Sequence, residues 1–91
     1  ISLDEFISKS NIEKIRLWKL DVEGHEIYAL HGAEKLLKEQ KIEAIIVEVS
    51  SDDVIPFLYD TKYSLFKFSG KKLIPIRDSN TRGNIIAIPS I

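Results

Sequence analysis

Three carboxylates, a histidine and a glycine follow an apolar run in the segment Trp18-Lys19-Leu20-Asp21-Val22-Glu23-Gly24-His25-Glu26. An ionised Asp21 at a strand tip can accept a proton, orient a substrate hydroxyl or hold a cation. His25 is of a type that serves as a general base near neutral pH or as a metal ligand. The alternative for Asp21, Glu23 and Glu26 is helix capping, since negative charge at a helix N-terminus contributes about 0.3 to 1 kcal/mol. The segment is the first candidate site.

Glu48 is the second unusual carboxylate, because it follows the apolar run Ile45-Ile46-Val47. A carboxylate is costly in a buried strand unless it is paired or reaches the edge of a site. Glu48 therefore either contacts a ligand at the sheet edge or meets solvent at the strand end. Lys19, inside an apolar strand, is in the same way either a ligand contact or an edge-facing lysine.

Hydrophobic periodicity predicts the elements that position these residues. Residues 2–9 suit a short helix and residues 15–20 a strand. An amphipathic helix of ordinary length begins near His25, and a nearly continuous β-branched run over 42–49 is typical of a central strand buried on both faces. Strand, helix and strand in this order predict a parallel crossover unit, which brings Asp21 and Glu48 to one sheet edge. Gly24 is expected to adopt a positive φ or to allow close backbone approach.

The second half of the chain predicts a short helix and an antiparallel part of the sheet. Pro56 limits the helix, which ends near Asp60. A hairpin joins residues 63–68 and 72–76, Pro75 places its second arm at a sheet edge, and residues 84–88 form a last strand. The cations nearby indicate either phosphate or nucleic-acid contact or, as we favour in a net-acidic chain, a solvated hairpin with core aromatics. The cations are Lys71, Lys72, Arg77 and Arg82, and the aromatic residues near them are Phe66 and Phe68.

Composition limits the classes of function. The 91 residues are 44% hydrophobic and 30% charged, which is typical of one soluble domain or part of one. A net charge of -1 and the lack of a membrane-length apolar run lead us to expect no nucleic-acid or membrane partner and, by default, a cytoplasmic location. Without cysteine the chain has no disulfide framework and no thiolate metal site. The absence of methionine and the start at Ile1 lead us to expect a fragment of a longer polypeptide.

The stretch Leu20-Asp21-Val22-Glu23-Gly24-His25-Glu26 resembles the FkbM family of S-adenosylmethionine-dependent methyltransferases. The resemblance extends through Leu30-His31-Gly32-Ala33-Glu34 and Ile46-Val47-Glu48-Val49, and back to Ser2-Leu3-Asp4-Glu5-Phe6. It implies an α/β fold in which residues 1–91 are the C-terminal half of a Rossmann-like methyltransferase sheet. Residues 15–21 would be its fourth strand, residues 42–48 its fifth, and the hairpin strands its antiparallel end.

The resemblance also implies methyl transfer to a hydroxyl of a sugar or secondary metabolite, with S-adenosylmethionine as cofactor. We assign no metal ligands. Asp21, Glu23 and His25 would then be catalytic, and Glu26 and Glu48 would bind the acceptor. The glycine-rich turn and the ribose-binding acid of such enzymes have no counterpart, since Gly24, Gly32, Gly70 and Gly83 stand alone. We therefore expect the cofactor-binding N-terminal half to be absent and these residues alone to be inactive.

Two other hypotheses come from different classes. A non-catalytic α/β half-domain would bind a protein partner or form a homo-oligomer through an unpaired sheet edge. A metal-dependent phosphodiester hydrolase would use Asp21 and Glu48, although Glu48 is followed by Val49-Ser50 without the lysine that many such nucleases place two positions on.

Overall fold

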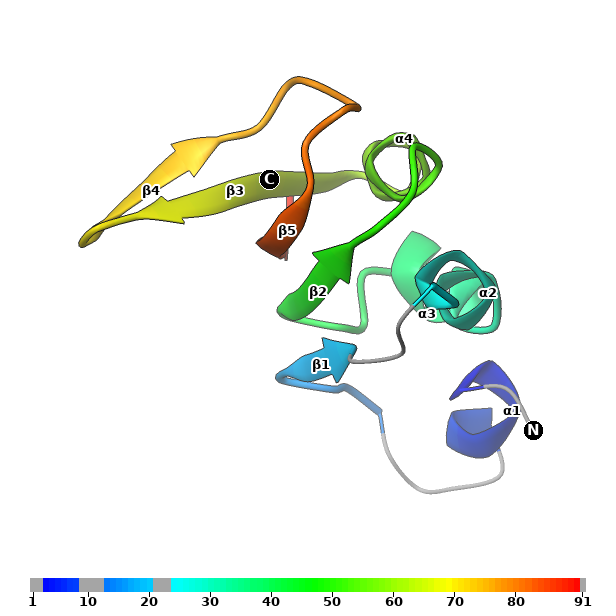
Figure 1. Ribbon diagram of the computed structural model, residues 1–91. Helices are drawn as coiled ribbons and strands as arrows, with labels where there is room; N and C mark the ends of the chain where they lie inside the picture. The colour runs from blue at the N-terminus through cyan, green and yellow to red at the C-terminus, as the bar shows by residue number, and fades with distance from the viewer. Residues whose placement is uncertain (1–2, 9–12, 21–23, 91) are drawn as a thin grey trace.

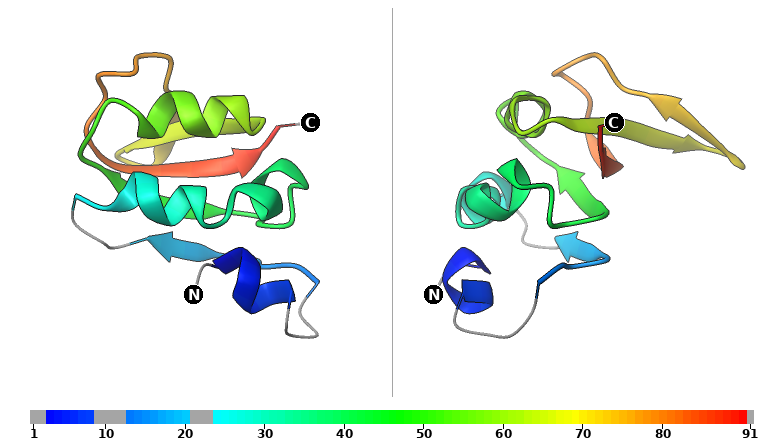
Figure 2. Two further views of the ribbon diagram at one scale, coloured as in Figure 1. Left: turned by 90° about the vertical axis from the view of Figure 1, so that its right-hand side faces the viewer. Right: turned by 180° about the vertical axis from the view of Figure 1, so that it is seen from behind.

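A computed structural model of the chain describes residues 3–8, 13–20 and 24–90. In these residues a mixed five-stranded sheet, in the order β1-β2-β5-β3-β4, is packed against helices on one face (Figures 1 and 2). The fold is therefore mixed α/β, as predicted. Its elements are α1 (Leu3–Ser8), β1 (Trp18–Leu20), α2 (Glu26–His31), α3 (Glu34–Lys38), β2 (Ile45–Val49), α4 (Val54–Asp60), β3 (Tyr63–Ser69), β4 (Lys72–Pro75) and β5 (Gly83–Pro89).

Strands β1 and β2 form the predicted parallel unit, with Leu20 beside Val47. Both are shorter than predicted, and an isolated parallel bridge between Ile15 and Ile42 continues their register. Strand β5 inserts between β2 and β3 and runs antiparallel to both. The start of β5 therefore lies beside the carboxyl end of β2, where Gly83 pairs with Val49.

The predicted single amphipathic helix is two short helices, α2 and α3, separated at Gly32 and Ala33. Gly32 favours the break because glycine costs up to about 1 kcal/mol in a helix interior. The side chain of Asp4 then accepts hydrogen bonds from the backbone N–H groups of Lys35 (3.0 Å) and Leu36 (3.1 Å). These are N–H groups that a helix start leaves unpaired, so α1 caps α3.

The core lies between the sheet and its helices. On β2, the side chains of Ile45, Val47 and Val49 are buried, whereas Ile46 is half-buried and Glu48 is exposed. The prediction that β2 is buried on both faces is therefore wrong for the described residues, because no described helix covers the second face (Figure 2).

Tyr63 anchors the hairpin side of the sheet to the core. Its side chain is 1% exposed, and its hydroxyl donates a hydrogen bond to the carbonyl oxygen of Ile42. Burial raises the pKa of Tyr63 to about 12, although the hydrogen bond to Ile42 acts in the opposite direction.

The helix and strands predicted for the second half are present. Helix α4 ends at Asp60 and carries Pro56 in its first turn, where a backbone N–H is not needed. Strand β4, which contains Pro75, is an edge strand. In the hairpin turn Gly70 has φ +62°, and a positive φ at the first central position is typical of a type II′ turn.

Candidate functional site

The carboxyl ends of β1 and β2 lie side by side and define the candidate site. Gly24 has φ +75°, as predicted, with open space where a Cβ would lie. It turns the chain toward α2, which begins at Glu26. Asp21 and Glu23, both predicted to be catalytic, lie outside the described residues.

Glu26 is buried and serves to join two segments of this edge. Its side chain is 3% exposed, and its Oε1 accepts a hydrogen bond of 2.7 Å from the Ser50 hydroxyl. Its place in the first turn of α2 also lets the helix N–H groups stabilise the negative charge. This contact fixes the start of α2 to the end of β2.

His25 is exposed at the N-cap position of α2, where it makes no side-chain capping hydrogen bond. Its ring lies 6.1 Å from that of Tyr28, centroid to centroid. His31, by contrast, packs edge-on against Phe57 at 4.5 Å, as expected for a packing residue. His25 is therefore open to a ligand approaching this edge.

Glu48 lies on the uncovered face of the sheet, in a hollow of about 200 Å³. Lys19 of β1 and Asn84 of β5 line the same hollow, and Asn84 is the register partner of Glu48. Among the described residues no ion pair includes Glu48 or Lys19. An ammonium, a carboxylate and an amide therefore share one hollow. Within the described residues, Glu48 forms no hydrogen bond or salt bridge with His25 or Glu26.

A salt bridge between Arg82 and Asp52 joins the loop after β2 to the loop before β5. Asp52 follows β2 and Arg82 precedes β5, so the bridge ties the carboxyl end of β2 to the start of β5. Neither this pair nor the place of Asn84 at the site was predicted from the sequence. Each depends on β5 pairing with β2, a long-range contact without a local sequence pattern.

Comparison with known families gives the decisive observation. The model of the family described as Methyltransferase FkbM domain matches residues 1–65, which include β1, β2 and the segments after both. The chain belongs to the FkbM methyltransferase-domain family. No curated protein and no solved structure matches the chain.

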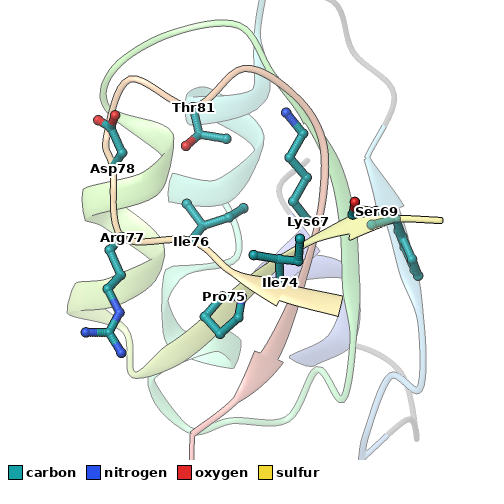
Figure 3. A pocket seen from close by; sticks show the side chains of 9 residues that line it. Lys67, Ser69, Ile74, Pro75, Ile76, Arg77, Asp78 and Thr81 are labelled. Atoms are coloured by element: carbon teal, nitrogen blue, oxygen red, sulfur yellow. The ribbon is translucent and has the colours of Figure 1, made fainter. Parts of the chain in front are cut away.

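FkbM membership raises the question of whether the described residues fit S-adenosylmethionine. The hollow at Glu48 measures about 200 Å³, whereas small-molecule sites are roughly 300 to 1,000 Å³. Larger hollows lie elsewhere on the described residues. One of about 420 Å³ lies beside the β3–β4 hairpin, where Lys67 extends toward Thr81 (Figure 3), and others of about 440 and 420 Å³ lie beside α4 and β3 and beside α1 and α3. None of the predicted site residues lines any of these hollows. The described residues of the predicted site in this FkbM chain therefore form no hollow of the size that a cofactor needs.

The described residues also contain no group of three or more His, Asp or Glu side chains that could hold a metal ion. Nor does any described helix have the length and apolar character needed to cross a membrane.

Proposed function

We propose that this chain is part of an S-adenosylmethionine-dependent O-methyltransferase with a Rossmann-like sheet, acting on a hydroxyl of a sugar or secondary metabolite. Membership of the FkbM family supports methyl transfer. The observation that carries the location of the site is the shared hollow of Lys19, Glu48 and Asn84 at the carboxyl ends of β1 and β2. Ligands of open α/β sheets bind at this edge.

The hollow of about 200 Å³ is smaller than a typical small-molecule site, so its three side chains suit single hydroxyl groups of an acceptor that extends beyond it. A lysine ammonium donates hydrogen bonds, an ionised carboxylate accepts them, and an amide does both. A hydroxyl group is both donor and acceptor, so each of the three groups offers it a partner. Glu48 therefore binds and orients the acceptor, as its exposed position on the sheet allows.

The catalytic roles belong to Asp21, Glu23 and His25 in this proposal. Methyl transfer to oxygen requires the acceptor oxygen to lie in line with the methyl group, which makes positioning the main contribution of the protein. A base at this edge takes the proton of the acceptor hydroxyl, which contributes typically about 10² to 10⁴ in rate. His25 is exposed at the start of α2, and the bond between Glu26 and Ser50 holds that helix start against β2.

The family implies that S-adenosylmethionine is the methyl donor. Because the described residues do not fit it, we assign them to the acceptor and to proton transfer. We assign no described residue to the binding of the methyl donor.

The test is transfer of a tritiated methyl group from S-adenosylmethionine to a panel of sugars and hydroxylated metabolites by the full-length protein. Glu48→Gln removes the charge and keeps the size of the side chain. Loss of a hydrogen bond to a charged group should lower kcat/KM about 10- to 100-fold, mainly through KM. The matched control is Glu43→Gln, an exposed glutamate before β2. Equal kcat/KM values for the two variants would contradict the placement of the acceptor.

A further inference from the structure

The outer half of the β3–β4 hairpin extends beyond the rest of the sheet (Figure 1). Strand β3 pairs with β5 only over Tyr63 to Phe66, and beyond that point it pairs with β4 alone. Phe68, Leu73 and Ile74 are 57%, 45% and 48% exposed. The prediction that the hairpin aromatics belong to the core is therefore wrong for Phe68, because β3 continues past the strand that would flank it.

The hairpin and the residues that flank it are strongly basic. Residues 61–77 contain five lysine or arginine residues and no aspartate or glutamate. Residues 1–60 hold seven basic and thirteen acidic residues, whereas residues 61–91 hold six basic and one acidic residue. The net charge of -1 is thus the sum of a charge of -6 on residues 1–60 and a charge of +5 on residues 61–91. An anionic surface would attract the hairpin and repel the rest of the chain.

The hairpin cations are not neutralised within the described part of the chain. Lys67, Lys71 and Lys72 are exposed, and none of them belongs to an ion pair there. The acidic residues that flank the basic segment are Asp60 and Asp78, and Asp78 lines the hollow beside Lys67. Asp78 also accepts a hydrogen bond from the backbone N–H of Asn80. Three lysines near the hairpin end are therefore available to an anionic partner.

Strand register arranges apolar and basic side chains around one tip. Phe68 pairs with Leu73, and Lys67 pairs with Ile74, which places the two pairs on opposite faces of the hairpin. Lys72 is next along the ladder, and Lys71 lies in the turn.

We propose that this tip docks on an anionic membrane surface. Phe68 and Leu73 enter the headgroup region there, and the three lysines contact lipid phosphates.

A membrane surface fits these residues better than a nucleic acid does. Proteins that bind single-stranded nucleic acids stack successive bases on aromatic side chains. In residues 61–77, Tyr63 is buried and Phe66 half-buried, which leaves Phe68 as the exposed aromatic side chain of this segment. Exposed aliphatic side chains gain free energy in the headgroup region and cannot stack on bases. The inference departs from the sequence-based expectation of no membrane partner, which considered spanning segments.

The test is flotation of the full-length protein with phosphatidylcholine vesicles that contain or lack phosphatidylserine. Binding should require phosphatidylserine and weaken with added salt. Each lysine near an anionic surface contributes about fivefold in affinity, so Lys71→Gln with Lys72→Gln should weaken binding about thirtyfold. Phe68→Ser with Leu73→Ser should also weaken it, whereas Phe68→Trp should bind and show a blue-shifted emission on the vesicles.

Matched controls lie at the other end of the sheet. Lys14→Gln with Arg16→Gln removes two exposed cations, and Leu17→Ser removes an apolar side chain that is 56% exposed. Both controls should bind as the unmodified protein does. The proposal is overturned by equal binding to neutral vesicles, by no binding to either kind, by controls as weak as the hairpin variants, or by binding to single-stranded DNA or RNA in place of vesicles.

Discussion

At the scale of single residues, the two candidate acceptor-binding carboxylates have opposite surroundings. Glu26 is buried and bonded to Ser50, whereas Glu48 is exposed beside Lys19 and Asn84. Sequence pattern singled out Glu26 as part of the acidic segment that starts a helix. It singled out Glu48 because a carboxylate next to an apolar run needs a partner or solvent. It did not distinguish them, since burial depends on elements that are distant along the chain.

Tyr63 provides a prediction for alkaline pH. Its pKa is about 12 in the folded chain against 10.0 for an unperturbed phenol. The neutral phenol therefore contributes stability that is fully present below about pH 10 and is lost as the pH rises through about 12. We expect the free energy of unfolding, measured in urea, to fall over this range more steeply for the unmodified protein than for Tyr63→Phe.

The control for this prediction is Tyr28→Phe, because Tyr28 is 71% exposed. Its pH dependence should match that of the unmodified protein, because Tyr63 keeps its buried position in this variant. A Tyr63→Phe variant with an unchanged alkaline slope would contradict the account of Tyr63.

At the scale of elements, apolar periodicity was sufficient for the strands and for the helical character of residues 26–38. It was not sufficient for the break between α2 and α3, because the side chain that caps α3 is that of Asp4, in another helix. Pro75 correctly predicted an edge strand. The insertion of β5 between β2 and β3 could not be read from local pattern, and with it Asn84 was missed at the site.

The cap on α3 gives a prediction for stability. Asp4→Ala leaves the N–H groups of Lys35 and Leu36 without their acceptor and should lower the free energy of unfolding by about 1 to 2 kcal/mol. Asp53→Ala is the control, because Asp53 stands at the N-cap of α4 and makes no side-chain capping hydrogen bond. It should change stability by less than about 0.5 kcal/mol. Equal losses for the two variants in urea denaturation would refute the capping role.

At the scale of the whole molecule, the sheet separates two kinds of surface. Helices cover one face, and the other face carries Glu48, Lys19 and Asn84 at the strand ends. The hairpin extends from the far edge and carries three of the six basic residues of the second half. Composition predicted one globular domain or part of one, but net charge alone concealed this division. Average charge carries no information on where charges lie.

The most direct test of the account is methyl transfer by full-length protein carrying Asp21→Ala, with tritiated S-adenosylmethionine and the same acceptor panel. Circular dichroism should show an unchanged fold. The account predicts that methyl transfer by the unmodified protein falls at least about 100-fold in this variant, because acceptor positioning and proton removal fail together. Full activity of Asp21→Ala would contradict the assignment of the site to the carboxyl ends of β1 and β2.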